Sequence, residues 1–269
     1  MTYPFTTDSS EHDRLLAQGT LIDPLTRGVL QEAGLGPGMR VLDLGSGAGN
    51  VARIAADLVG PTGHVVGIES DPATVELARH ATDASYPSNV EYRVGDIQKL
   101  DGIDDAFDAV VGRLVLMYVT DAAATLRRAA SRVRPGGVVC MQEIDVAYRW
   151  VGGGTTPLWD AAHRWVNETL ETAGADGRLG PRLFTAFRAA GLSGPELRME
   201  AVAAGGPDAP AWGWANIIAG LLPLMERLGV TTRTEVDPTT LADRLLADAL
   251  AHDACVIGPI MTGAWVRRG

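Results

Sequence analysis

The sequence is poor in the residues that build disulfide frameworks and metal sites. It has two cysteines in 269 residues, Cys140 and Cys255, which are far apart and lack CxxC spacing. Neither a disulfide framework nor a zinc site is therefore indicated. Each cysteine falls in an apolar run that predicts a buried strand. No two histidines have metal-ligand spacing either, so we expect no metal.

Basic charge is also scarce. Lys99 is the only lysine, and 23 Lys and Arg against 33 Asp and Glu give a net charge of −10. Affinity for nucleic acid and for anionic lipid comes largely from Lys and Arg, so we expect neither as a partner. The sequence has no run of about 18 apolar residues, and its first residues lack a basic start followed by an apolar stretch. These absences predict a cytoplasmic protein.

Between residues 39 and 146, short apolar runs alternate with helical patterns, which is typical of βαβ units in a parallel sheet. We predict five strands, at 39–44, 64–69, 90–94, 107–112 and 137–145. Apolar residues at three- and four-residue spacing predict helices between them, over 50–59, 72–85 and 121–133. The fold class is therefore α/β, with a mostly parallel sheet and helices on both faces.

The remaining segments depart from this rhythm. Residues 8–33 hold two helical stretches, and we interpret residues 1–33 as an N-terminal helical lid on a domain spanning 34–269. Helical insertions are expected after the fifth and sixth strands, at about 147–180 and 205–253. Elsewhere we predict a helix over 181–190, a strand near 196–203 and a last strand within 255–266 that Gly258, Pro259 and Gly263 interrupt.

The most informative segment is an apolar strand that runs into a glycine-rich turn and opens a helix, Val41-Leu42-Asp43-Leu44-Gly45-Ser46-Gly47-Ala48-Gly49-Asn50. Glycine lets a ligand approach the main chain, and the carboxyl edge of a parallel sheet provides the crevice where ligands bind. The spacing is GxGxG rather than the GxGxxG of dinucleotide-binding folds, which disfavours a nicotinamide cofactor.

Carboxylates follow the next two strands. Glu69, with Ser70 beside it, ends the second strand, where it could accept hydrogen bonds from both hydroxyls of a ribose. Asp96 follows the third strand, where it could accept from an adenine amine, and Ile97 could cover the ring. Each acid alone could instead be a solvated strand end or a turn cap. Their order along the chain favours an adenosine site.

This ordered set resembles the class I S-adenosylmethionine-dependent methyltransferase family, over residues 39–146. The segment Phe107–Val111 and the turn Arg134–Gly137 match the family's fourth strand and the turn before its fifth. The resemblance implies a Rossmann-like seven-stranded sheet, S-adenosylmethionine as cofactor, S-adenosylhomocysteine as product and a small-molecule acceptor. The implied cofactor-binding residues are Asp43, Gly45, Ser46, Gly47, Asn50, Glu69, Ser70, Asp96, Ile97 and Arg113.

Two further assignments have alternatives, besides those already given for Glu69 and Asp96. Asp43 could merely brace the glycine turn. Arg113 is assigned by position alone, since it follows the fourth strand where the family lines the methionine end of the cofactor; it could equally pair with a nearby acid.

Three residues are candidates for a catalytic base. Glu143 and Asp145 end the fifth strand, and strand alternation places both on one face of the sheet; the alternative is that they brace the lid through hydrogen bonds. His163 lies on the predicted insertion helix, on the same face as Trp159, although it could equally be structural. A methyl transfer needs alignment above all, so a base is optional.

The sequence indicates only the general chemical class of the methyl acceptor. Aromatic residues gather in the segments that interrupt the fold, namely Tyr148, Trp150, Trp159, Trp165, Trp212 and Trp214. They suit a partly apolar or aromatic metabolite, but they could also cover core surface or an oligomer contact, such as that of a homodimer.

Our functional hypothesis is methyl transfer to an O, N or C atom of such a metabolite. The alternatives are a relative that binds the same cofactor but catalyses another reaction, such as a cyclisation, and a non-catalytic assembly protein. The segment 212–228 motivates the last of these, because it is apolar on more than one side and must be buried somewhere.

Overall fold

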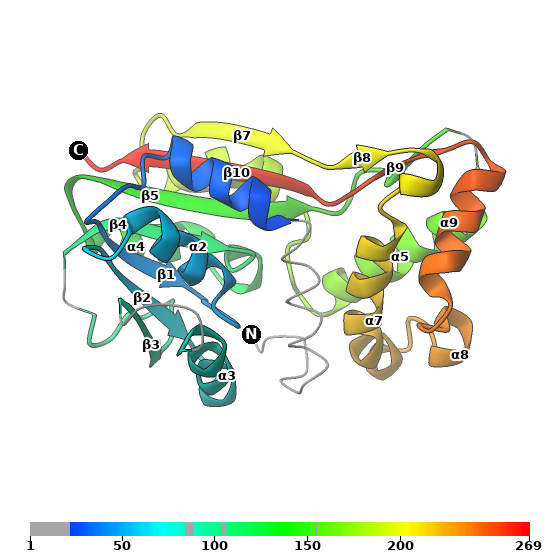
Figure 1. Ribbon diagram of the computed structural model, residues 1–269, viewed down its shortest axis with the longest axis horizontal. Helices are drawn as coiled ribbons and strands as arrows, with labels where there is room; N and C mark the ends of the chain where they lie inside the picture. Colours follow the sequence, from blue (N-terminus) through cyan, green and yellow to red (C-terminus); the bar gives the residue numbers. More distant parts are fainter. Residues whose placement is uncertain (1–21, 84–88, 104–105, 154) are drawn as a thin grey trace. The chain divides into compact units, whose positions relative to one another are not determined.

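The structure is a computed structural model that describes residues 22–83, 89–103, 106–153 and 155–269. The first 21 residues of the predicted lid lie outside the described residues. The described chain forms two compact units. We call residues 22–143, 181–198 and 262–269 the sheet unit, and residues 144–180 and 199–261 the helical unit (Figure 1).

A seven-stranded sheet, in the order β3-β2-β1-β4-β5-β10-β7, forms the framework of the sheet unit. The first five strands in this order pair in parallel. The end of β10 lies beside the start of β5 and runs the other way, since Gly136 N–H donates to Arg268 O and Arg268 N–H donates to Gly137 O. This confirms the predicted seven-stranded, mostly parallel sheet. The strands are β1 (Arg40–Leu44), β2 (His64–Glu69), β3 (Val90–Val94), β4 (Phe107–Arg113), β5 (Val133–Asp145), β7 (Glu196–Glu200) and β10 (Ile260–Arg267).

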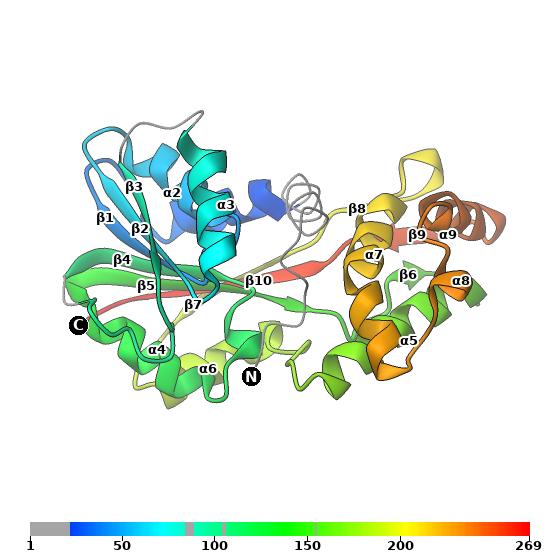
Figure 2. The ribbon, with the colours of Figure 1, turned by 90° about the horizontal axis from the view of Figure 1, so that it is seen from below.

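Helices cover both faces of the sheet. Figure 2 shows α2 (Asn50–Val59) and α3 (Pro72–Asp83) on one face, and α4 (Ala122–Ser131) and α6 (Leu183–Ala189) on the other. The helical residues 22–32 share a buried apolar cluster with α2 and α3. Such two-sided burial explains why β1 and β2 read as continuous apolar runs rather than as alternating patterns.

Local sequence signals predicted the bounds of the crossover helices closely. The predicted helix over 50–59 coincides with α2, and α3 fills the predicted helix over 72–85 as far as the structure describes it, to Asp83. The helix α4 is shorter than predicted because Asp121 is its N-cap, accepting from the Ala124 N–H at 2.9 Å, and Arg132 is its C-cap. Side-chain capping of this kind satisfies a helix-end donor that has no partner within the helix.

Three helices form the body of the helical unit: α5 (Pro157–Thr172), α7 (Ala211–Leu228) and α9 (Leu241–Ala251). Each packs against the other two. Ile218, Leu222 and Met225 of α7 are almost fully buried. The apolar helix expected at 212–228 is therefore buried within its own unit. A short helix α8 (Arg233–Val236) and an antiparallel sheet of β6 (Val151–Gly152), β9 (Cys255–Ile257) and β8 (Ala203–Ala204) complete the unit.

Some boundaries differ from the sequence-based predictions. The last apolar run is two strands, β9 and β10, separated at Gly258-Pro259, because proline cannot donate a ladder hydrogen bond. Cys140 is buried as predicted, and burial raises the pKa of its thiol to about 12. The prediction for Cys255 was wrong, since its side chain is exposed. No described helix is both long and apolar enough to span a bilayer.

Candidate functional site

The predicted cofactor residues come together at one edge of the sheet. The strands β1, β2, β3 and β4 are parallel, so their carboxyl ends lie on the same side. The glycine turn follows β1, Glu69 ends β2, Asp96 follows β3 and Arg113 ends β4. Because β1 lies between β2 and β4, the chain order reverses at this point, which is where open α/β sheets bind ligands.

The three glycines of the turn have different tasks. All three have positive φ angles, of 62° at Gly45, 50° at Gly47 and 83° at Gly49. A Cβ atom at Gly45 would lie 2.4 Å from Val115 Cγ1, and one at Gly49 would lie 2.2 Å from Tyr92 Oη. A Cβ atom at Gly47 would have no neighbour within 4 Å. Packing thus requires the outer glycines, whereas Gly47 leaves open space where a ligand could approach the main chain.

The Glu69 carboxylate is fixed beside this open space. Its Oε2 accepts from the Gly47 N–H at 3.2 Å, and its Oε1 accepts from the Ser70 N–H at 2.6 Å and from Ser70 Oγ at 2.9 Å. The Asp71 N–H donates to the same Oε1 at 3.1 Å. These contacts tie the end of β2 to the turn after β1 and hold a half-exposed acceptor at the sheet edge.

Ser46 and Asn50 make contacts that hold the glycine turn to its neighbouring elements. The Ser46 N–H donates to Ile68 O at 2.9 Å, and a Cβ atom on Gly67 would lie only 2.9 Å from Ser46 Cβ. The serine side chain therefore lies buried against β2. Asn50 begins α2 and accepts from Arg53 Nη2 at 2.6 Å, so its amide oxygen is engaged within the helix.

Asp43 is a buried acid in the strand before the turn. Its side chain is 1% exposed, and neither carboxylate oxygen makes a hydrogen bond to the described residues. Burial raises the pKa of Asp43 to about 8; nearby Arg113 and the Ala52 N–H oppose the shift, and Glu69 adds to it. A carboxyl group in this position is largely protonated at neutral pH.

The pKa of Asp43 predicts a pH-dependent stability. Between its ordinary value near 4 and about 8, the folded protein holds a proton that the unfolded chain has lost, so stability falls as pH rises through this window. We expect Asp43→Asn to flatten the fall by up to about 1.4 kcal/mol per pH unit. Urea unfolding of both proteins at pH 5, 6, 7 and 8 measures the slopes. Parallel slopes would contradict the assigned pKa.

Arg113 makes the ion pair that the alternative interpretation predicted. Its Nη1 donates to Asp23 Oδ1 at 2.7 Å and to Thr26 Oγ1 at 2.8 Å, and its side chain is only 8% exposed. Thr26 Oγ1 in turn donates to Gln142 Oε1 at 2.6 Å. This series of hydrogen bonds links the helical residues 22–32 to β4 and β5. Sequence reasoning missed Asp23 and Thr26, although their i, i+3 spacing places both on one helix face.

Asp96 and Ile97 lie in the turn after β3. Asp96 Oδ1 accepts from the Gln98 N–H at 2.8 Å, and its Oδ2 lies 3.6 Å from Lys99 Nζ. The Asp96 side chain is 42% exposed, so its carboxylate caps the turn and also remains accessible from solvent. Ile97 is half-buried beside it.

The strand-end acids bind backbone amides. Glu143 is fully buried, and its Oε1 accepts from the Val115 N–H at 3.0 Å and from the Leu116 N–H at 2.7 Å. Asp145 Oδ1 accepts from the Ala147 N–H at 2.9 Å. Glu143 thus braces the segment after β4, and Asp145 braces the first residues after β5. Bracing of the N-terminal lid and a catalytic role for either acid both stay predictions.

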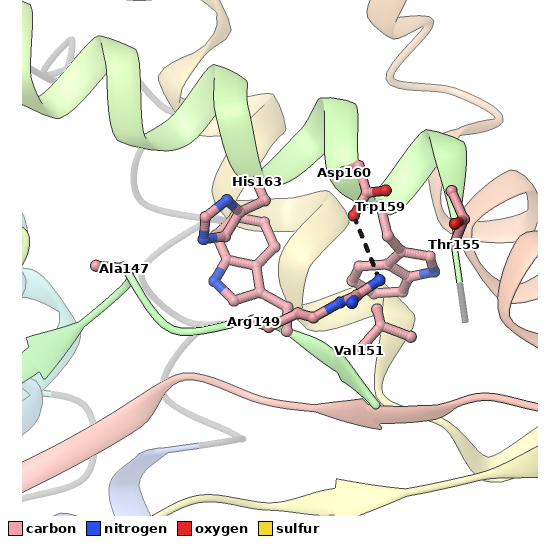
Figure 3. Close-up of a pocket in the computed structure, with 8 residues that line it drawn as sticks. Ala147, Arg149, Val151, Thr155, Trp159, Asp160 and His163 are labelled. Atoms are coloured by element: carbon pink, nitrogen blue, oxygen red, sulfur yellow. Dashed lines mark ion pairs between the residues drawn. The ribbon is translucent and has the colours of Figure 1, made fainter. Parts of the chain in front are cut away.

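His163 lines a cavity in the helical unit (Figure 3). Its ring meets Trp150 edge-on, with centroids 5.0 Å apart, and Trp150 stacks on Trp214 at 3.6 Å. Trp159 lines the same cavity, as its shared helix face with His163 predicted. Most of the predicted aromatic wall is core: Trp150, Trp159, Trp165 and Trp214 are buried, whereas Trp212 is 40% exposed.

Residues 35–174 match a protein family described as a methyltransferase domain. The chain belongs to this family. Its seven-stranded sheet and the order of its motifs make it a member of the class I S-adenosylmethionine-dependent methyltransferases, whose cofactor is S-adenosylmethionine.

Curated proteins named as methyltransferases are similar to parts of the chain. It is 35% identical over 112 residues to an arsenite methyltransferase of Halobacterium salinarum, covering 42% of this chain and 29% of that protein. It is 28% identical over 182 residues to a ubiquinone biosynthesis O-methyltransferase of Azorhizobium caulinodans, covering 61% and 65%. The chain thus spans less than two thirds of either relative's length.

Solved structures share the fold. A phosphoethanolamine N-methyltransferase of Haemonchus contortus, in complex with phosphomonomethylethanolamine and S-adenosylhomocysteine, matches with a TM-score of 0.55 at 18% identity, over 91% of this chain and 52% of that one. The [4+2]-cyclase SpnF matches with a TM-score of 0.54 at 21% identity, over 92% and 81%. At such identities the likeness shows the fold alone.

The residues at the sheet edge fit the cofactor of this family. The open space at Gly47 would admit a ligand against the main chain, and Glu69 presents a fixed acceptor beside it. Asp96 presents a second, accessible carboxylate one strand further along. These are the acceptors that ribose hydroxyls and an adenine amine require.

Replacing Glu69 tests this fit. Loss of a charged acceptor in Glu69→Ala should weaken S-adenosylmethionine binding by about 1.5 to 3 kcal/mol, or roughly ten- to a hundred-fold. Calorimetry with the purified variant measures the change. Glu91→Ala is the matched control, since Glu91 is an exposed acid of the same sheet that pairs with Arg93. An unchanged affinity in Glu69→Ala would remove Glu69 from the site.

Proposed function

We propose that the protein transfers a methyl group from S-adenosylmethionine to an O, N or C atom of a small, partly apolar or aromatic metabolite. One observation carries the proposal: the open main chain at Gly47 lies beside the fixed carboxylate of Glu69, at the carboxyl edge of the sheet. When bound, S-adenosylmethionine supplies an electrophilic methyl group on a positively charged sulfur.

The chain's own residues would bind the cofactor and align it with the methyl acceptor. Glu69 would hold the ribose hydroxyls, Asp96 and Ile97 the adenine, and the main chain at Gly45–Gly47 the methionine portion. Arg113 supports the edge indirectly, because its ion pair with Asp23 fixes the helical residues 22–32 against β4. Alignment of the two reactants is the minimum that such a displacement needs.

A base is needed only where the acceptor must lose a proton. We propose His163 or Asp145 for that role ahead of Glu143, since Glu143 Oε1 is committed to two backbone amides. An acceptor with a neutral amine would need neither residue. The acceptor therefore has to be known before the base can be assigned.

The test is a screen of candidate metabolites for release of S-adenosylhomocysteine by the purified protein. We expect at least one aromatic hydroxy compound or amine to turn over, and the same reaction to be absent in Gly47→Val. A candidate that is consumed without release of S-adenosylhomocysteine would indicate a cyclase-type reaction instead. The assembly alternative has lost its motivation, because α5 and α9 cover the apolar faces of α7.

A further inference from the structure

Asp43 is a buried carboxyl group that the proposed function does not use. Its side chain is 1% exposed, and neither oxygen makes a hydrogen bond to the described residues. In the register of the sheet it lies opposite Gly67 of β2, which has no side chain, and opposite Val111 of β4, which is apolar and fully buried. The two neighbouring strands therefore place no polar side chain directly beside this carboxyl group.

Two ionisable side chains lie one step further toward the sheet edge. Glu69 follows Gly67 by two residues and Arg113 follows Val111 by two, so strand alternation places both on the same face of the sheet as Asp43. Diagonal neighbours on adjacent strands lie roughly 7–8 Å apart. Over that distance charges act on one another through the protein interior without contact.

The other titratable groups around β1 are engaged elsewhere. Arg53 and Asp57 of α2 each have other partners, the first in the glycine turn and the second in an exposed ion pair. The Tyr92 hydroxyl of β3 shares a hydrogen bond with a threonine of α3. Among the described residues, the charges that act on the buried carboxyl group are thus those of Arg113 and Glu69.

This surrounding keeps Asp43 protonated at neutral pH. Burial raises its pKa to about 8, Arg113 opposes the shift and Glu69 adds to it. Part of the Arg113 charge is already compensated, because its Nη1 pairs with Asp23 Oδ1 at 2.7 Å. A further positive charge at the sheet edge would favour the ionised form of Asp43.

S-adenosylmethionine carries such a charge, whereas S-adenosylhomocysteine does not. The sulfur that joins the ribose to the methionine portion is a cationic sulfonium in the cofactor and a neutral thioether in the product. With the ribose at Glu69 and the methionine portion at the open main chain of Gly47, this sulfur would lie beside the turn that follows β1. Its charge would reach Asp43 through space, so the buried carboxyl group needs no contact with the ligand.

We propose that binding of S-adenosylmethionine drives a proton from Asp43 into solvent, and that S-adenosylhomocysteine binds without this release. The inference rests on the proposed function. Methyl transfer converts the sulfonium to a thioether, after which Asp43 takes a proton back from solvent. Because the ionised carboxylate attracts only the cationic ligand, the preference for cofactor over product rises with pH and levels off above about 8, where Asp43 is ionised in every form.

Calorimetry in buffers of different ionisation enthalpy counts the protons released on binding. At pH 7 we expect the protein to release about half to one proton more with S-adenosylmethionine than with S-adenosylhomocysteine. In Asp43→Asn this excess should disappear, because the amide has the same shape and no proton to lose. Asp57→Asn is the matched control, since it changes an exposed acid of α2 and should keep the excess. The same excess in Asp43→Asn as in the unchanged protein would overturn the proposal.

The ratio of the two affinities gives a second readout. Between pH 6 and 8.5 it should shift toward S-adenosylmethionine by at least about tenfold, as expected for charges roughly 7–8 Å apart at an effective dielectric constant of about 20. In Asp43→Asn the shift should stay within about threefold. Equal shifts in the two proteins would contradict the coupling.

Infrared difference spectra of the unchanged protein keep the proposal testable if Asp43→Asn does not fold. Binding of S-adenosylmethionine should remove the C=O band of a protonated carboxyl group, and binding of S-adenosylhomocysteine should leave it. A band that persists with bound S-adenosylmethionine would overturn the coupling alone. A protein that binds neither ligand would instead overturn the proposed function, on which the coupling rests.

Discussion

Gly47→Val should lose S-adenosylmethionine binding while the protein stays folded. A valine side chain would enter the space that is open above Gly47, where a Cβ atom meets nothing within 4 Å, and would displace any ligand from the main chain. We expect the affinity to fall at least about a hundred-fold, which corresponds to about 2.7 kcal/mol. Calorimetry gives the affinity, and circular dichroism shows whether the sheet persists.

Strain at a positive φ angle needs a separate control. Gly47 has φ 50°, a conformation that costs a β-branched residue free energy wherever it occurs. Gly191 has φ 84° after α6, also with nothing within 4 Å of an added Cβ atom, and belongs to the same unit. Gly191→Val should therefore show a comparable loss of stability and normal cofactor affinity. If Gly47→Val binds the cofactor as tightly as this control does, the turn is not the site.

The meeting of the glycine turn, Glu69 and Asp96 at one sheet edge was predictable because its signals are local. An apolar strand, a glycine turn and a helix start are read from ten consecutive residues, and parallel pairing then carries Glu69 and Asp96 to the same edge. It was not predictable which glycines packing requires and which one leaves open space for a ligand. It depends on Val115 and Tyr92, which reach the turn from the end of β4 and from β3 across long stretches of chain.

Contacts between distant segments account for the other differences. The partners of Arg113 lie 87 and 90 residues before it, and no local pattern selects them from among the other acids and hydroxyls. The cavity of the helical unit also depends on contacts between segments that are distant in the sequence. The shared helix face of Trp159 and His163 was readable from their spacing, but the approach of Arg149 to Asp160 and the stacking of Trp150 on Trp214 follow only from the packing of the unit.

Glu143→Ala should be among the most destabilising single substitutions in the sheet unit. The carboxylate accepts from the N–H groups of Val115 and Leu116, two residues that are 6% and 2% exposed. Buried donors left without an acceptor cost about 1 to 3 kcal/mol each, so the free energy of unfolding should drop by about 2 to 6 kcal/mol. Urea unfolding measures the drop. Glu76→Ala, which removes an exposed acid paired with Arg79, should cost less than about 1 kcal/mol.

The conservative variant Glu143→Gln separates bracing from proton transfer. The glutamine side chain keeps an oxygen that can accept from both amides, so this variant should preserve S-adenosylmethionine affinity and keep the single-turnover rate of methyl transfer within about tenfold. Loss of a general base would instead slow that step about a hundred- to ten-thousand-fold at unchanged affinity. Since Val115 also abuts Gly45, a failing brace should weaken cofactor binding along with stability, as Glu143→Ala would show. A rate collapse in Glu143→Gln with affinity and stability intact would make Glu143 the base after all.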